Sequence, residues 1–318
     1  MQTIGSPLFW TVFLVGVAAI LALDLGVLNR KAHAVRPREA ALWTAFCVTL
    51  AGLFALWIGW RFGARPALEF TTGYLIEYAL SVDNLFVFLV VFSYFRVPPQ
   101  FQHRVLFWGI LGALFLRAFF ILTGAALLAR FHWMIYLFGA FLVVTGVKLL
   151  VSGEGEVDPE NNPMLRLARR FLRVTPRYHG QRFFVLEQGK RFATPLFLVL
   201  IVIEGTDVVF AVDSIPAIFG VTQDPFIVFT SNIFAILGLR SLYFLLHDFM
   251  GRFHYLKYGL GLVLAFVGAK MVASAWVKVP IGISLGVIVL LLAASVGASW
   301  LFPPARAEEP GTGGQEKE

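Results

Sequence analysis

The chain is 318 residues long, 58% of its residues are hydrophobic, 14% are charged, and its mean hydropathy is +0.78. This is more apolar surface than a soluble domain can bury, so the composition excludes a soluble globular protein and predicts an all-α, polytopic membrane bundle. The formal net charge of +7 is interpreted as a sign of orientation in the membrane, and we expect no nucleic acid partner. The single cysteine, Cys47, excludes an internal disulfide and a thiolate metal site.

Nine apolar segments approach the about 20 residues that a helix needs to cross a bilayer. The first has no basic residue before it and no small-residue cleavage site after it, so we expect a retained helix and not a signal peptide. Between the segments, eighteen Lys and Arg residues fall on one side and four on the other, which predicts an outside N-terminus and a cytoplasmic C-terminus. The predicted spans are 8–28, 42–60, 70–92, 105–129, 133–151, 195–217, 226–246, 258–276 and 280–302.

A long hydrophilic linker, residues 152–194, joins the fifth and sixth segments. Residues 164–173 alternate apolar positions with arginines in the pattern of a short amphipathic helix, which would either lie on anionic lipid at the cytoplasmic face or be an ordinary solvated helix. The runs 183–186 and 191–194 predict a small β-hairpin. The Glu- and Gly-rich residues 303–318 predict a disordered tail.

Four carboxylates lie inside these apolar segments with one spacing. Glu77 and Asp83 are six residues apart, and so are Asp207 and Asp213, which lie 130 residues further along the chain. An ionised carboxylate in hydrocarbon costs at least about 2.5–3.5 kcal/mol, so each of the four requires a cation, a proton or an arginine. Residues six apart on a straight helix point about 120° apart, so one ion cannot be shared within a helix without unwinding or a partner helix.

The carboxylate spacing belongs to a longer internal repeat. When the two acidic motifs are aligned, Arg117 falls near Arg240 and Lys148 near Lys270. Each repeat unit has three spans, an odd number, so the copies must cross the membrane in opposite directions, as in the inverted repeats of secondary transporters. The predicted organisation is two helices in 1–69, a first repeat in 70–151, the linker 152–194, a second repeat in 195–276, a last helix in 277–302 and the tail 303–318.

A twofold axis near the midplane predicts which acids meet. It would put Glu77 level with Asp213, and Asp83 level with Asp207, between the two repeats. Local unwinding would also bring acids together, and the residues that favour it are Gly73, Gly205 and Pro216.

Neutral oxygen donors accompany the acids, and such oxygen-rich sites suit Mn²⁺, Ca²⁺ or Mg²⁺ better than Cu⁺ or Zn²⁺. We expect Arg117 and Arg240 to neutralise two of the acids and hold the helices together, a role favoured over substrate contact. Asp24 is a possible fifth carboxylate, and capping of the first helix is the alternative. The candidate metal-binding residues are Glu77, Asp83, Asn84, Asp207, Asp213 and Asn232, with Ser81, Thr206, Ser214 and Ser231 nearby.

Three runs of sequence together resemble the TerC family of integral membrane proteins: EYALSVDN at 77–84, EGTDVVFAVDSIPAIF at 204–219 and DPFIVFTSNIFAILGLR at 224–240. The resemblance covers roughly residues 5–300. It implies a bacterial cytoplasmic-membrane protein, in a family named for tellurium resistance that includes manganese exporters and belongs to a lysine-exporter-like superfamily. The family's motif residues fall on Glu77, Asp83, Asn84, Asp207, Asp213, Asn232 and Arg240.

The leading functional hypothesis is Mn²⁺ export by alternating access, driven by protons or the membrane potential, with no permanent cofactor. Alternatives are a membrane assembly or metal-delivery factor for exported proteins, and Ca²⁺/H⁺ exchange. Amino-acid export follows from superfamily analogy, but four acids favour a cation over a zwitterion. We do not expect an enzyme, because the sequence contains neither the Gly-x-Gly-Asp motif of intramembrane aspartyl proteases nor His-Glu-x-x-His.

Overall fold

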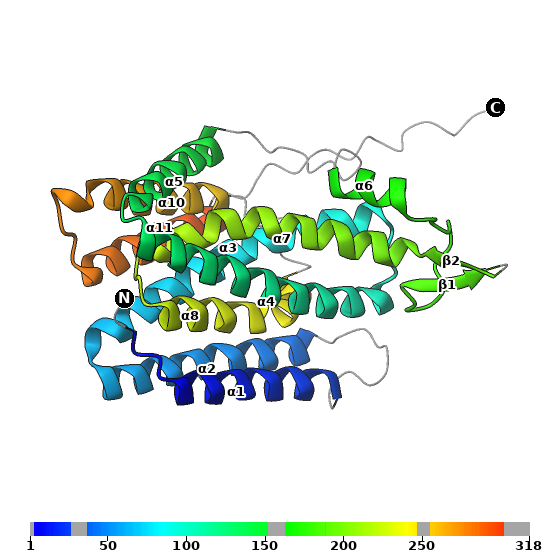
Figure 1. Cartoon of the computed structure of the whole chain (residues 1–318), viewed down its shortest axis with the longest axis horizontal. Coiled ribbons are helices and arrows are strands. Elements are labelled where there is room, and N and C mark those ends of the chain that lie inside the picture. The colour runs from blue at the N-terminus through cyan, green and yellow to red at the C-terminus, as the bar shows by residue number, and fades with distance from the viewer. Residues whose placement is uncertain (1–2, 27–36, 152–162, 188, 247–254, 302–318) are drawn as a thin grey trace.

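The computed structural model describes residues 3–26, 37–151, 163–187, 189–246 and 255–301 (Figure 1). Long helices lie side by side and form the bundle, and a short helix and a hairpin lie at one end. The helices are α1 (Pro7–Gly26), α2 (Pro37–Phe62), α3 (Ala64–Tyr94), α4 (Pro99–Arg130), α5 (Met134–Val151), α6 (Pro163–Phe171), α7 (Pro195–Phe219), α8 (Pro225–Leu237), α9 (Leu239–Leu246), α10 (Leu256–Val272) and α11 (Ile281–Leu301).

Seven of the described helices are long and apolar enough to cross a membrane, namely α2, α3, α4, α5, α7, α10 and α11. Shorter apolar stretches lie in Pro7–Ala22 and Pro225–Leu237. Large apolar side chains such as Trp60 and Phe115 are mostly exposed, as expected for a surface that faces lipid. The all-α polytopic architecture is confirmed, and the count of nine spans stays a prediction.

The helix breaks differ from those that the sequence predicted. α7 runs without interruption through Gly205, and Pro216 lies inside its last turns; α3 continues through Gly73 in the same way. Pro216 lacks a backbone N–H, so α7 loses one backbone hydrogen bond there. Only three residues of the helix follow Pro216, so the helix tolerates this loss. The predicted span 226–246 is instead divided into α8 and α9 at Gly238.

Three helix pairs have the most extensive contacts in the bundle: α3 with α8, α4 with α7, and α5 with α10. Glycines allow α5 and α10 to approach at two places. A Cβ at Gly146 would lie 2.6 Å from the Gly261 carbonyl oxygen, and a Cβ at Gly268 would lie 2.6 Å from the Gly139 carbonyl oxygen. Because the order of contacts is reversed along the two helices, α5 and α10 run antiparallel.

The linker forms the elements that its sequence predicted. Strands β1 (Phe184–Glu187) and β2 (Lys190–Ala193) pair antiparallel, and α6 precedes them. Leu165 and Ala168 of α6 are buried in a cluster that includes residues of α7, whereas Leu167 and Phe171 are exposed. The apolar side of α6 therefore docks partly on the protein itself. The predicted disordered tail lies outside the described residues.

Candidate functional site

A buried arginine joins three helices in the middle of the bundle. The side chain of Arg117, from α4, is 2% exposed, and its guanidinium forms ion pairs with the carboxylates of Glu77 on α3 and Asp207 on α7. The Arg117 Nη2 atom lies 3.5 Å from Asp207 Oδ1. Nη1 donates a hydrogen bond of 3.4 Å to Ser214 Oγ. These contacts are the ones expected of an arginine that neutralises membrane carboxylates.

This cluster lies near the middle of the helices that form it. Asp207 is the central residue of the 25-residue α7, and Glu77 is the fourteenth of 31 residues in α3. At a rise of about 1.5 Å per residue, Asp207 is about 18 Å from either end of its helix, which would put it close to the centre of a hydrocarbon core about 30 Å thick. Two carboxylates share one guanidinium, so when both are ionised one negative charge remains for another cation or a proton.

Several buried polar atoms on α3, α4, α7 and α8 have no hydrogen-bond partner among the described residues. The pattern is unusual because buried polar groups are normally paired, and an unpaired one costs about 1–3 kcal/mol. α3 and α8 approach where Gly73 faces Ser231, one helical turn before Glu77 and one residue before Asn232. The unpartnered atoms include Glu77 Oε2, Ser81 Oγ, Arg117 Nε, Asp207 Oδ2, and the Oδ1 and Nδ2 atoms of Asn232.

The second acid of the second motif lies in a different environment. Asp213 is half-buried, and its Oδ1 atom accepts a hydrogen bond of 3.4 Å from Thr145 on α5. The observed contacts join Glu77 with Asp207 through Arg117, which is not the pairing of Glu77 with Asp213 that the repeat predicted. One guanidinium therefore contacts the equivalent acid of each repeat.

The remaining predicted site residues are only partly described. Asn84 is buried on α3, two turns from Glu77. The side chains of Asp24, Asp83 and Arg240 lie outside the described residues. Within the described part of the chain, no group of three or more His, Cys, Asp or Glu side chains could hold a metal ion. The six-residue metal site therefore stays a prediction, and the arrangement seen is a charge-paired one.

Sequence reasoning missed one acid at this site. Glu204 lies one helical turn before Asp207, and its carboxylate occupies the space where a side chain at Gly112 of α4 would lie. The alignment of the repeats sets Glu204 against Tyr74, so the search for matched acids passed over it. The available signal was an acid one turn from another within the same apolar segment.

These features define a class: a polytopic helical membrane protein with charged residues buried near the middle of its bundle, as in many transporters. Comparison with known proteins then gives the family. The chain belongs to the Integral membrane protein TerC family, whose sequence pattern matches residues 62–307.

Relatives match nearly the whole chain. A Myxococcus xanthus protein, "Uncharacterized membrane protein STKORF319", is 56% identical over 312 residues, which cover 97% of this chain and 98% of the relative. An Escherichia coli K12 protein, "Putative membrane-bound redox modulator Alx", is 50% identical over 297 residues, which cover 91% and 92% of the two chains. A Photorhabdus laumondii protein of the same name is 48% identical over 305 residues, covering 93% and 95%. No solved structure matches the chain.

Proposed function

We propose that this protein exports a divalent cation across the bacterial cytoplasmic membrane by alternating access, and that Mn²⁺ is its main substrate. The observation that carries the proposal is the Arg117 cluster, in which Glu77 and Asp207 share one cation at mid-membrane depth. Glu77 and Asp207 each have a buried carboxylate oxygen without a hydrogen-bond partner among the described residues, as do Ser81 on α3 and Asn232 on α8. Carboxylate, amide and hydroxyl oxygens are the ligands that hard divalent ions prefer.

In this proposal Arg117 acts as a tethered counter-ion. Its guanidinium pairs with the acids whenever the substrate is absent, so the empty site is not left with two uncompensated carboxylates. An entering divalent cation supplies two positive charges, satisfies Glu77 and Asp207 directly, and releases the arginine. When the cation leaves on the other side, Arg117 returns, and the empty protein is spared two unpaired carboxylates in hydrocarbon.

Helix packing supports the inverted repeat that alternating access needs. The sequence alignment equates Gly139 with Gly261, and Gly146 with Gly268. Gly139 packs against Gly268, and Gly146 packs against Gly261. Exchanging each residue for its equivalent converts one contact into the other, as a twofold axis would. The antiparallel course of α5 and α10 agrees with opposite crossing directions, and the pairs α3–α8 and α4–α7 are exchanged by the same operation.

Several relatives are named as membrane-bound redox modulators. In this chain the one cysteine, Cys47, is buried, so it offers no internal dithiol couple. An effect on cellular redox state would follow indirectly from the metal content of the cell under this proposal.

Inverted membrane vesicles from cells with and without the protein test the proposal. We expect vesicles with the protein to accumulate Mn²⁺ above the background of vesicles without it, and Ca²⁺ and Mg²⁺ to be accumulated less. A preference for Ca²⁺ with coupled proton movement would favour Ca²⁺/H⁺ exchange. Absence of accumulation for every divalent ion tested would favour an assembly or metal-delivery factor.

A further inference from the structure

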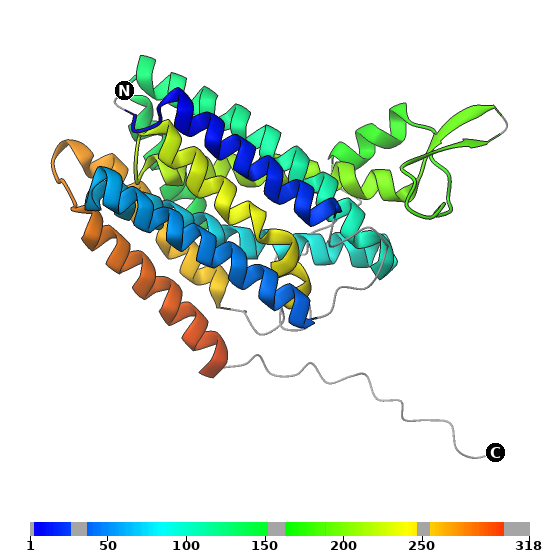
Figure 2. The same cartoon turned by 90° about the horizontal axis from the view of Figure 1, so that it is seen from below.

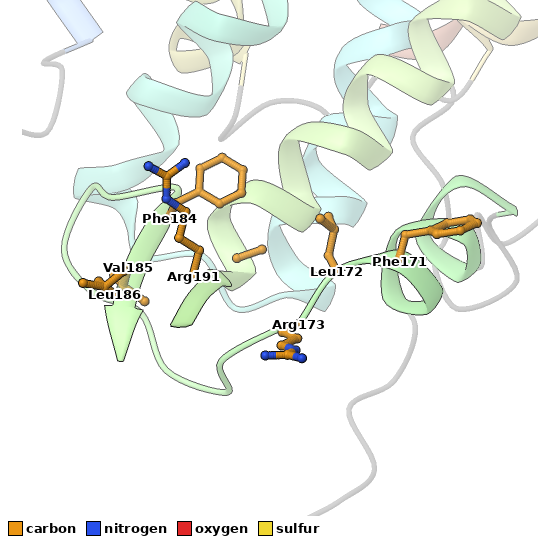
Figure 3. A pocket seen from close by; sticks show the side chains of 8 residues that line it. Phe171, Leu172, Arg173, Phe184, Val185, Leu186 and Arg191 are labelled. Atoms are coloured by element: carbon orange, nitrogen blue, oxygen red, sulfur yellow. The ribbon is translucent and has the colours of Figure 1, made fainter. Parts of the chain in front are cut away.

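Helix α6 and the hairpin of β1 and β2 form an arm, whose apolar and cationic surface the proposed transport function does not use. Phe171 is 75% exposed and Leu186 is 71% exposed, although both are large apolar side chains. They border an open groove of about 700 Å³ between the end of α6 and the hairpin (Figure 3). The groove also contains the guanidinium-bearing residues Arg173 and Arg191. Neither arginine forms an ion pair with a described residue.

The two faces of the hairpin differ in charge. Leu186 pairs across the strands with Arg191, and Phe184 pairs with Ala193, so these four residues share one face. The next pair, Glu187 with Lys190, lies on the opposite face. There the Glu187 carboxylate also contacts His179 Nε2 at 3.1 Å. Most of the hairpin residues that line the groove belong to the first face, which carries one positive charge and apolar groups; Val185 of the other face also lines it, whereas Glu187 does not.

The arm is fixed to the bundle. Tyr178 donates a hydrogen bond of 2.7 Å to the carbonyl oxygen of Phe95, at the end of α3. Burial raises the pKa of Tyr178 to about 12, so its hydroxyl keeps this proton at physiological pH. The ring of Phe184 packs 4.4 Å from that of Phe197 on α7, centroid to centroid. A firmly attached arm does not have to be ordered when it meets a partner.

The position of the arm suits the membrane surface. Figure 2 shows α6 and the hairpin projecting to one side of the bundle, at the end where α4 and α7 begin. This is the end that the distribution of basic residues predicts to be cytoplasmic. Exposed Phe and Leu beside exposed Arg is the composition of an interfacial segment, whose apolar groups enter the headgroup region while the basic groups contact lipid phosphates.

We infer that the groove between α6 and the hairpin docks onto anionic phospholipid of the inner leaflet. Arg173 and Arg191, whose side chains point in different directions (Figure 3), contact separate headgroup phosphates, and Phe171 and Leu186 lie among the upper acyl carbons. The inference is independent of the transported substrate. Lipid docking would anchor the arm beside the cytoplasmic ends of α4 and α7. These helices supply Arg117 and Asp207, so lipid charge would influence how they move.

A nitroxide label at residue 186 tests this docking in the full-length protein. Leu186→Cys is made in a Cys47→Ala background, labelled, and reconstituted in nanodiscs of phosphatidylcholine alone or mixed with phosphatidylglycerol. Collisions with oxygen report lipid contact, and collisions with a water-soluble nickel chelate report water contact. With phosphatidylglycerol present we expect the label to gain oxygen contact and lose nickel contact.

Neighbouring residues on opposite faces provide a matched control. Arg191→Gln and Lys190→Gln remove the same charge one residue apart. A basic residue at an anionic surface is worth about fivefold in binding, so Arg191→Gln should lower the ratio of docked to undocked arm about fivefold, and Lys190→Gln should change it much less. Equal effects of the two variants, or a label equally exposed to water in both lipids, would overturn the inference. So would the same shift produced by inorganic phosphate in phosphatidylcholine nanodiscs, since that result would assign the groove to a soluble anion.

Discussion

Replacing Arg117 with methionine removes the charge that joins α3, α4 and α7. Methionine keeps most of the length of the side chain, so the loss of packing is small. The variant leaves Glu77, which is 0% exposed, and Asp207, which is 5% exposed, without their cation. Removing one partner of a buried ion pair costs about 3–5 kcal/mol. One ionised carboxylate left in hydrocarbon costs a similar amount, about 2.5–3.5 kcal/mol, while the second acid can take up a proton.

We therefore expect Arg117→Met to lower the free energy of unfolding by about 3–5 kcal/mol. The measurement is denaturant unfolding of the purified protein in detergent, followed by circular dichroism. Arg130→Met, at the exposed end of the same helix, is the matched control and should change stability by about 0.5 kcal/mol or less. Adding Glu77→Gln to Arg117→Met should restore part of the loss, because the two residues interact. Equal stability of the Arg117 and Arg130 variants would refute the neutralising role of Arg117.

Three further predictions separate function from stability. Asp213→Asn removes a charge that the cation needs but keeps the size of the side chain, so cellular Mn²⁺ should rise under manganese stress at unchanged protein abundance. Glu187→Gln in the linker is the control, and normal export by the Asp213 variant would contradict a role of Asp213 in binding the cation. Asn232→Leu should abolish vesicle uptake while thermal stability holds or rises, because its amide has no partner among the described residues; unchanged uptake would remove Asn232 from the site. Gly146→Ala should lower the free energy of unfolding by about 1–3 kcal/mol, since the new Cβ would lie 2.6 Å from a carbonyl oxygen of α10. Gly286→Ala is the control, because a Cβ there meets nothing within 4 Å, and equal stability of the two variants would contradict the close packing of α5 and α10.

The charged part of the site could be predicted from the sequence because its physical rule is local. A carboxylate or arginine within an apolar segment requires a partner, wherever the segment lies in the fold. Arg117 could therefore be assigned to neutralise acids before any helix packing was known. The identity of its partners depends on which faces of α3 and α7 meet α4. The repeat predicted Glu77 opposite Asp213, whereas the shared guanidinium draws in Asp207.

Other features depend on packing that sequence patterns do not contain. Gly205 and Pro216 are ordinary signals of a broken helix, yet α7 is continuous through both, and the break falls at Gly238 instead. Glu204 escaped notice because it has no acidic counterpart in the repeat, although Gly112 leaves room for it in the bundle. The hairpin was predicted correctly because a Glu-Gln-Gly-Lys turn between two apolar runs is a short-range signal.

Flux into liposomes that contain only this protein tests the proposed transport function most directly. A fluorescent indicator trapped inside reports Mn²⁺ entry, and the wild-type protein is compared with the double variant Glu77→Gln/Asp207→Asn. The variant removes both carboxylates that Arg117 pairs with but keeps their size. The proposal predicts saturable Mn²⁺ entry with the wild-type protein and entry at the rate of protein-free liposomes with the variant. Equal entry through both proteins, or none through the wild type, would contradict a cation path through the Arg117 cluster.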